Sequence, residues 1–200
     1  MRPEFVSFAL FNDRIFYHIR NMASSDNKKW FPLRVTYRQE MKVKHDLDRK
    51  RIECFIPMTY VYKIKGQRRI KELKPAIHNL IFVHISEEGL KQYKDSSDLP
   101  IRYIMNRETN TPVYIPDKEM TNFIGISGSH DEQLIYLNPD PRNWEKGQLV
   151  KIIGGIFKGY SGRFMRIKGD RRIVVEIPGV IAIATGFIHP SLLVPIENEE

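Results

Sequence analysis

Two of the six histidines, His78 and His84, and the single cysteine, Cys54, are the candidates in this chain for acid–base, metal or nucleophilic chemistry. His78 and His84 flank an apolar run, but no carboxylate or cysteine lies at a spacing typical of a metal site or a catalytic pair. Cys54 lies in the strand-like sequence ECFIP, where a buried structural thiol is expected. No G-x-x-x-x-G-K-[ST] phosphate loop is present. These patterns predict a protein that is not an enzyme and uses no metal or cofactor.

Positive charge points to a different chemistry, the binding of an anionic partner. The chain has 32 Lys and Arg against 24 Asp and Glu, a net charge of +8. Cations crowd into a hairpin-like segment with a predicted tip at 65–68: Lys63, Lys65, Arg68, Arg69, Lys71 and Lys74. Such a segment can contact phosphate, and it equally suits a solvated hairpin, so both interpretations stay open.

These residues need a scaffold, and the first part of the chain predicts an α+β fold, a sheet with its helices packed on one face. The strand-like sequences are 30–37, 54–58, 61–64, 80–85 and 101–105. The run LIFVHI at 80–85 is apolar almost throughout, which is typical of a central strand. Aromatic and β-branched residues in the others favour neighbouring strands of the same sheet.

Three helices are expected beside these strands. Val43 and Leu47 give one apolar face to a helix over 39–51, whose outer face can form the pairs Glu40–Lys44 and Asp46–Lys50. Ser86 predicts the cap of a second helix that runs towards Lys94. A third helix begins at Pro116, with its apolar side chains on one side: Met120, Phe123 and Ile124.

The second part of the chain predicts a small β-barrel. Residues 127–143 are rich in Gly, Ser, Asn and Pro, which indicates a linker. Five short strands follow within 144–200, separated by Gly- or Pro-marked turns: 148–153, 162–167, 171–177, 180–185 and 191–194. The domains expected are thus an N-terminal extension of unknown role (1–29), an α+β domain (30–126), the linker, and an SH3-like barrel with an acidic tail (144–200).

The chain is expected to act in the cytoplasm. No run approaches the ~20 apolar residues that a membrane-spanning helix needs. A lone cysteine excludes an internal disulfide framework and suits a reducing compartment. A monomer is the expected form, and no membrane partner is expected.

Several segments together resemble the NusG family of transcription elongation factors. The stretch GQLVKIIGGIFKGYSGRF is similar to a KOW motif, and a Trp-led strand, a charged helix, ECFIPMTYVYKIKGQRRIKELKP and NLIFV resemble the NusG N-terminal (NGN) domain. Within the family, ECFIPM and PAIHNLIFV resemble the specialised RfaH and UpxY-type antiterminators. The resemblance implies an NGN sheet with helices followed by a KOW barrel.

The resemblance also implies a partner, RNA polymerase. In this family an apolar patch of the NGN domain binds the clamp helices of the polymerase, which suppresses pausing and termination, here on long operons such as surface polysaccharide loci. The positions that match the patch are Phe55, Ile77, Leu80 and Phe82. The same four side chains also suit an ordinary core, and this alternative stays open.

Specialised members additionally contact the non-template DNA strand. The matching or neighbouring positions at the first helix and the hairpin are Arg38, Gln39, Lys42, Lys65 and Arg68. Lys91, Gln92 and Tyr93 match the segment that touches the polymerase gate loop in RfaH, although the His-Thr-Thr of RfaH is absent.

Departures from the family pattern in the barrel lead to two predictions, and two alternative functions also stay open. The glycines and Pro178 of the barrel oppose the helical refolding of RfaH, so a constitutive barrel is predicted. Pro178 stands where NusG has a phenylalanine that helps to bind Rho or ribosomal protein S10, which argues against Rho stimulation and leaves S10 as a candidate partner. A housekeeping NusG-type factor and a KOW-containing RNA- or ribosome-binding protein remain the alternative functions.

Overall fold

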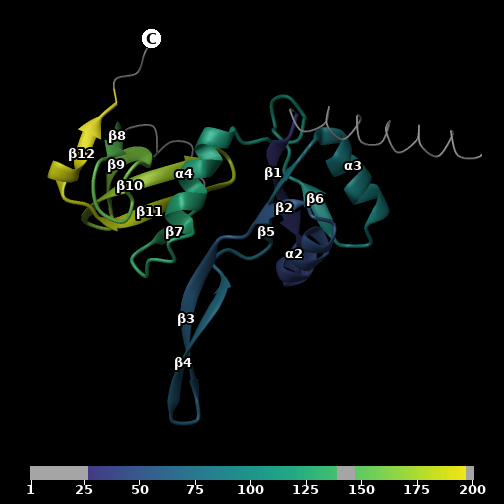
Figure 1. Ribbon diagram of the computed structural model, residues 1–200, viewed down its shortest axis with the longest axis horizontal. Coiled ribbons are helices and arrows are strands. Elements are labelled where there is room, and N and C mark those ends of the chain that lie inside the picture. The colour runs from purple at the N-terminus through teal and green to yellow at the C-terminus, as the bar shows by residue number, and fades with distance from the viewer. Residues whose placement is uncertain (1–26, 139–146, 197–200) are drawn as a thin grey trace, which may run out of the picture.

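The N-terminal sheet has four antiparallel strands in the order β2-β5-β1-β6. Its strands are β1 (Lys29–Val35), β2 (Glu53–Phe55), β5 (Leu80–Ile85) and β6 (Ile101–Tyr103). The computed structural model describes residues 27–138 and 147–196 (Figure 1). Most of the predicted N-terminal extension, the predicted start of the barrel at Trp144 and the end of the acidic tail lie outside the described residues.

The central strand β5 confirms the prediction from its apolar run, because both of its faces are covered. Ile81 and Val83 face α2 (Glu40–Arg49) and α3 (Glu87–Ser96), while Leu80 and Phe82 face α4 (Asp117–Ser127). All four of these side chains are at most 3% exposed. The expectation of helices on one face is therefore wrong: α2 and α3 cover one face of the sheet and α4 covers the other, with one hydrophobic cluster on each face, because the strands bury apolar side chains on both sides.

The predicted helices are present, with one correction to the charges on α2. Val43 and Leu47 are fully buried, and the hydroxyl of Ser86 accepts the Gly89 N–H as the cap of α3. The expected pair of Glu40 with Lys44 is wrong. Lys44 binds Asp48 instead, at 2.9 Å, because Glu40 is turned inward and only 2% exposed.

The hairpin is a separate two-stranded element that projects from the N-terminal sheet (Figure 1). Strands β3 (Met58–Lys65) and β4 (Arg68–Pro75) pair along their whole length, and the last pair is Lys65 with Arg68. Gly66 at the tip has a φ of 63°, a conformation that glycine adopts without strain. The predicted tip is therefore confirmed.

The C-terminal part is a six-stranded antiparallel sheet in the order β12-β8-β9-β10-β11-β7, curled around its own core (Figure 1). Its strands are β7 (Ile135–Leu137), β8 (Gln148–Ile152), β9 (Ser161–Ile167), β10 (Asp170–Ile177), β11 (Ile181–Phe187) and β12 (Leu193–Pro195), with the short helix η2 (Pro190–Leu192) before β12. The five predicted barrel strands correspond to β8–β12. Strand β7 differs from the predicted linker, because it pairs with β11 and extends the sheet.

One glycine of this sheet is required by close packing. A Cβ on Gly162 would lie 2.6 Å from Cγ2 of Ile173 and 2.7 Å from the carbonyl oxygen of Val174. A real Cβ does not approach other atoms so closely, so β9 can lie against β10 at this point only without a side chain.

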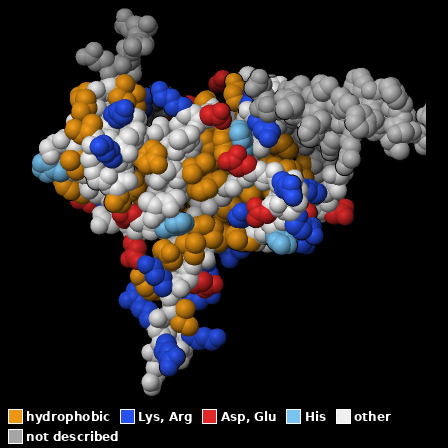
Figure 2. All heavy atoms as spheres, in the orientation of Figure 1, with side chains coloured by type: hydrophobic (Ala, Val, Ile, Leu, Met, Phe, Trp, Pro, Cys, Tyr) orange, Lys and Arg blue, Asp and Glu red, His pale blue; other side chains and the backbone are white. Residues whose placement is uncertain are grey.

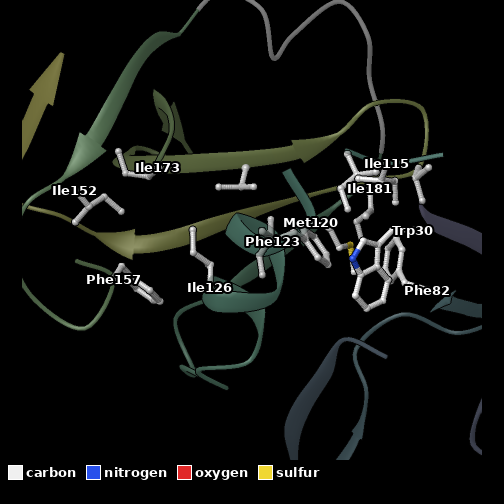
Figure 3. Packing of buried hydrophobic residues seen from close by; sticks show 14 of the residues in the cluster. Trp30, Phe82, Ile115, Met120, Phe123, Ile126, Ile152, Phe157, Ile173 and Ile181 are labelled. Atoms are coloured by element: carbon white, nitrogen blue, oxygen red, sulfur yellow. The ribbon is translucent and has the colours of Figure 1, made fainter. Parts of the chain in front are cut away.

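Helix α4 joins the two parts into one continuous hydrophobic cluster (Figure 3). Met120, Phe123 and Ile126 of α4 are fully buried. On one side the cluster includes Trp30 and Phe82 of the N-terminal sheet. On the other side it includes barrel residues such as Ile173 and Ile181. The helix thus lies between the N-terminal sheet and the barrel.

Candidate functional site

The four apolar residues predicted to bind a partner helix come together on the α4 side of the N-terminal sheet. Phe55, Ile77, Leu80 and Phe82 belong to one cluster. The register of strands β2 and β5 explains part of this arrangement, because Phe55 on β2 pairs directly with Phe82 on β5. Their ring centroids are 6.5 Å apart. The sheet therefore assembles an apolar surface of the predicted composition.

Helix α4 already covers part of this surface. The ring of Phe123 lies 5.5 Å from Phe82 and meets Phe55 edge-on at 6.4 Å, which is a favourable aromatic geometry. Leu80 and Phe82 are consequently buried, whereas Phe55 and Ile77 keep part of their surface exposed. The two buried residues act as core in this conformation, and the two half-buried residues form the accessible edge of the patch.

The barrel covers the other side of α4. The Ser161 N–H donates to Oδ1 of Asn122 at 3.1 Å, and Gly125 lies so close to Tyr160 that a Cβ there would overlap the ring. The sequence predicted the helix from its apolar side but not these barrel contacts. The only sequence signal for them was Gly125 itself, a residue that weakens a helix interior and so indicates a packing constraint.

The predicted nucleic-acid residues fall into two groups. Arg38 belongs to the short helix η1 (Thr36–Arg38), Gln39 immediately precedes α2, and Lys42 lies in its first turn. Lys65 and Arg68 lie at the tip of the hairpin, eight residues along each strand from its base. At about 3.3 Å per residue, the strands separate the tip from the base by roughly 25 Å. The structure therefore presents two basic regions and not one patch.

Several cations near these two regions are already paired with carboxylates. Lys44, Lys50, Lys63 and Lys71 each lie within 3.1 Å of a carboxylate oxygen. Within residues 27–138 and 147–196, no carboxylate pairs with the predicted cations: Arg38, Lys42, Lys65 and Arg68. Their charge is thus not neutralised by a described carboxylate and stays available for phosphate.

The hairpin has one aromatic face and one mainly basic face. Arg69 lies over the ring of Tyr62 at 3.8 Å, and Lys71 over that of Tyr60 at 4.0 Å. Midway along its length the hairpin is tied to the loop after α4, since Glu132 accepts the Tyr62 hydroxyl at 2.8 Å and pairs with Lys71 at 2.9 Å. Figure 2 shows the Lys and Arg side chains distributed along the hairpin.

The two histidines lie apart and have different surroundings. Nδ1 of His78 lies 3.5 Å from the buried Glu40 carboxylate. The ring of His84 stacks on Trp30 at 4.9 Å, and its Nδ1 lies 2.8 Å from Glu53. His84 also lines a cleft of about 430 Å³ between the sheet, α4 and Tyr160. No three metal-binding side chains gather in the part of the chain that the structure describes.

The cysteine has the properties of a structural thiol. Burial raises the pKa of Cys54 to about 11, so the thiolate is scarce at neutral pH. Its Sγ lies 3.9 Å from Oδ1 of Asp48, a carboxylate that does not activate a thiol. No helix among the described residues is long and apolar enough to cross a membrane.

Comparison with known proteins identifies the N-terminal part. Residues 28–124 match the family described as "Transcription termination factor nusG". Among solved structures, one described as "Domain interaction in Thermotoga maritima NusG" is similar over 86% of this chain and 98% of its own, with 20% sequence identity and a TM-score of 0.45. No curated protein matches the chain in sequence. Residues 28–124, from the start of β1 into α4, therefore form a domain of the NusG family, followed in this chain by the β-rich C-terminal domain.

Proposed function

We propose that this protein is a transcription elongation factor of the specialised NusG type, which binds the clamp helices of RNA polymerase and suppresses pausing and termination. One observation carries the proposal: in a NusG-family domain, the face of the sheet with Phe55, Ile77, Leu80 and Phe82 accepts a helix in the structure itself. A groove that packs one amphipathic helix has the shape and chemistry to bind another.

The burial of each residue assigns it a role in this proposal. Phe55 and Ile77 are half-buried and contact the clamp helices directly. Leu80 and Phe82 lie beneath α4 and support the surface from inside. Helix α4 packs on both the sheet and the barrel, so release of the barrel is the change that would loosen its cover over Leu80 and Phe82 and enlarge the surface for the clamp helices.

The test is binding of purified RNA polymerase, and of its isolated clamp helices, to the full chain. We expect Ile77→Asp to weaken binding at least about tenfold, because it places a charge at an apolar contact. Met105→Asp is the matched control, since Met105 is also a partly exposed hydrophobic residue, at 43%, but lies outside the cluster. Unchanged polymerase binding by Ile77→Asp would contradict the assigned patch. Binding of the full chain to ribosomal RNA but not to the polymerase would favour the KOW-type RNA-binding alternative.

The barrel offers a separate surface for a protein partner such as ribosomal protein S10. Ile156 is 71% exposed and Phe187 is 57% exposed, and both line a cleft of about 220 Å³. Exposed apolar side chains beside a cleft suit protein docking. Pro178 lies in the turn between β10 and β11, and the expectation that Rho is not stimulated stays a prediction. Loss of S10 binding in Ile156→Asp, with polymerase binding retained, would support this assignment.

The transcription targets need a genetic test. Transcript mapping after deletion distinguishes a specialised antiterminator from a housekeeping factor. Loss of read-through in one long operon is the result expected for the specialised form. A change across the genome would favour the housekeeping alternative.

A further inference from the structure

Tyr37 differs from the other exposed tyrosines, because nothing among the described residues packs on its ring. It is 83% exposed. Tyr60 and Tyr62 on the hairpin each have a cation over the ring, and Tyr114 has Lys29 at 4.5 Å. Tyr37 has no such ring contact with the described part of the chain, so both of its aromatic faces are open.

The backbone holds Tyr37 in this position at an energetic cost. Tyr37 and Arg38 have φ values of 60° and 53°, in the left-handed region that bulky residues rarely adopt. Asn79 fixes both ends of the turn: its side-chain oxygen accepts the Arg38 N–H at 3.0 Å, and its carbonyl accepts the Val35 N–H at 3.0 Å. The Thr36 N–H donates to the Pro100 carbonyl at 3.0 Å. The strained turn thus holds the Tyr37 ring in solvent, and the hydrogen bonds to Asn79 and Pro100 fix its backbone.

The charges around this ring suit a nucleic-acid strand. Arg38 and Lys42 follow closely in sequence, and neither is paired with a carboxylate in the described residues. An aromatic ring beside free cations is the combination with which proteins bind single strands, because the ring stacks on a base and the cations hold phosphates. In a duplex the faces of the bases are already stacked, so an exposed ring of this kind selects an unpaired base.

We propose that Tyr37 stacks on an unpaired nucleobase, with Arg38 and Lys42 holding the phosphates beside it. This inference rests on the proposed function, where the exposed single strand of the transcription bubble is the source of such a base. The proposal thus adds Tyr37, which would contact the base itself, to Arg38 and Lys42, which would contact phosphates. A nascent RNA would offer the same chemistry.

The experiment measures the affinity of the full chain for labelled single-stranded DNA and RNA of about twelve nucleotides by fluorescence anisotropy. Tyr37→Ala should weaken binding roughly 5- to 150-fold, the range that one base–aromatic stack provides. Tyr37→Phe should stay within about twofold, because stacking needs the ring and not the hydroxyl. Tyr114→Ala is the control for loss of an exposed tyrosine and should also stay within about twofold.

Each outcome decides the proposal. A loss confined to Tyr37→Ala supports the stack, and its appearance with DNA, RNA or both identifies the source of the base. Equal affinities for Tyr37→Ala and Tyr114→Ala, or a Tyr37→Phe loss as large as that of Tyr37→Ala, overturn it. Polymerase binding, measured on the same variants, separates this result from the proposed function, because Tyr37 lies outside the cluster that contacts the clamp helices.

Discussion

Replacing Gly125 by alanine should act on one contact, that between α4 and the barrel. Gly125 lies within α4, and a Cβ at this position would overlap the ring of Tyr160. The overlapped atoms are the far end of a side chain, and that ring borders the cleft of about 430 Å³. The ring can therefore swing towards solvent, at the expense of its packing against α4. The substitution therefore weakens the contact between α4 and the barrel without touching Phe123 or the sheet.

Two opposing effects set the size of the change. Alanine is better than glycine inside a helix by about 1 kcal/mol. Overpacking costs about 1–3 kcal/mol, and the lower half of this range applies because the Tyr160 ring has a way out. Gly125→Ala should therefore leave the stability of the whole chain nearly unchanged, or lower it by up to about 1 kcal/mol. In a Tyr160→Ala background the overlap is gone, and the same substitution should stabilise by about 1 kcal/mol.

The assay is a double-mutant cycle on urea unfolding, together with binding of the clamp helices. The cycle should give a coupling energy of about 1–2 kcal/mol between Gly125 and Tyr160. If the barrel must leave before the polymerase binds, a seam weakened by this amount raises the apparent affinity roughly 5- to 30-fold. Additive stability effects would refute the geometry. Coupling without any gain in affinity would refute the link between barrel release and polymerase binding.

Three further predictions concern single residues. Gly162→Ala should destabilise the barrel by about 2–3 kcal/mol in urea unfolding, because the neighbouring backbone carbonyl cannot rotate away; native stability would contradict the packing. Hydrogen bonding from Arg49 helps to hold the pKa of Asp46 low, so the stabilisation by its carboxylate is present at neutral pH and is lost progressively as the pH falls below about 4. Asp46→Asn should cost about 1 kcal/mol at pH 7 and less at lower pH, against less than about 0.5 kcal/mol for Asp48→Asn, whose side chain is half-exposed. Cys54 should react with iodoacetamide at pH 8 about 100-fold more slowly in the folded than in the unfolded chain, since its thiol pKa is about 11; equal rates would place the thiol at the surface.

The sequence predicted those elements whose pattern is local. The apolar run at 80–85 required a strand covered on both faces, and β5 lies between two clusters. The spacing of Val43 and Leu47 required one buried helix face, and both are fully buried. Ser86 required a helix start, and its hydroxyl caps α3. In each case the physical cause lies within a few neighbouring residues.

Features that depend on distant residues were not predictable in this way. Glu40 has the right spacing for a pair with Lys44, but its side chain points inward, is 2% exposed and lies 3.5 Å from Nδ1 of His78. Strand β7 is three residues long and exists because β11 offers it a free edge. Likewise, the left-handed turn at Tyr37 depends on Asn79, which lies far along the chain. Local spacing carries no information about such partners.

The apolar patch shows the same limit at the level of function. A surface that waits for a partner helix and a core that is already packed have the same composition, because both must exclude water from aromatic and aliphatic side chains. Phe55 and Phe82 were therefore compatible with both interpretations. In the structure, the contacts of Phe123 from α4 bury Phe82 and leave Phe55 partly exposed, and these contacts could not be read from the sequence.

The contacts of α4 also indicate where the molecule can separate. Towards the sheet, Phe123 packs against two aromatic rings and is fully buried, so separation there would expose a large apolar area. Towards the barrel, α4 shares a buried cluster with residues such as Ile173 and Ile181, while the contact near Tyr160 is bordered by a cleft and includes a hydrogen bond from Ser161, so this rim of the seam is in contact with solvent. Separation costs less where less apolar area is newly exposed. Both faces of α4 bury apolar residues, so the rim near Tyr160, which borders solvent, is the place where a substitution can weaken the barrel seam without disturbing the sheet.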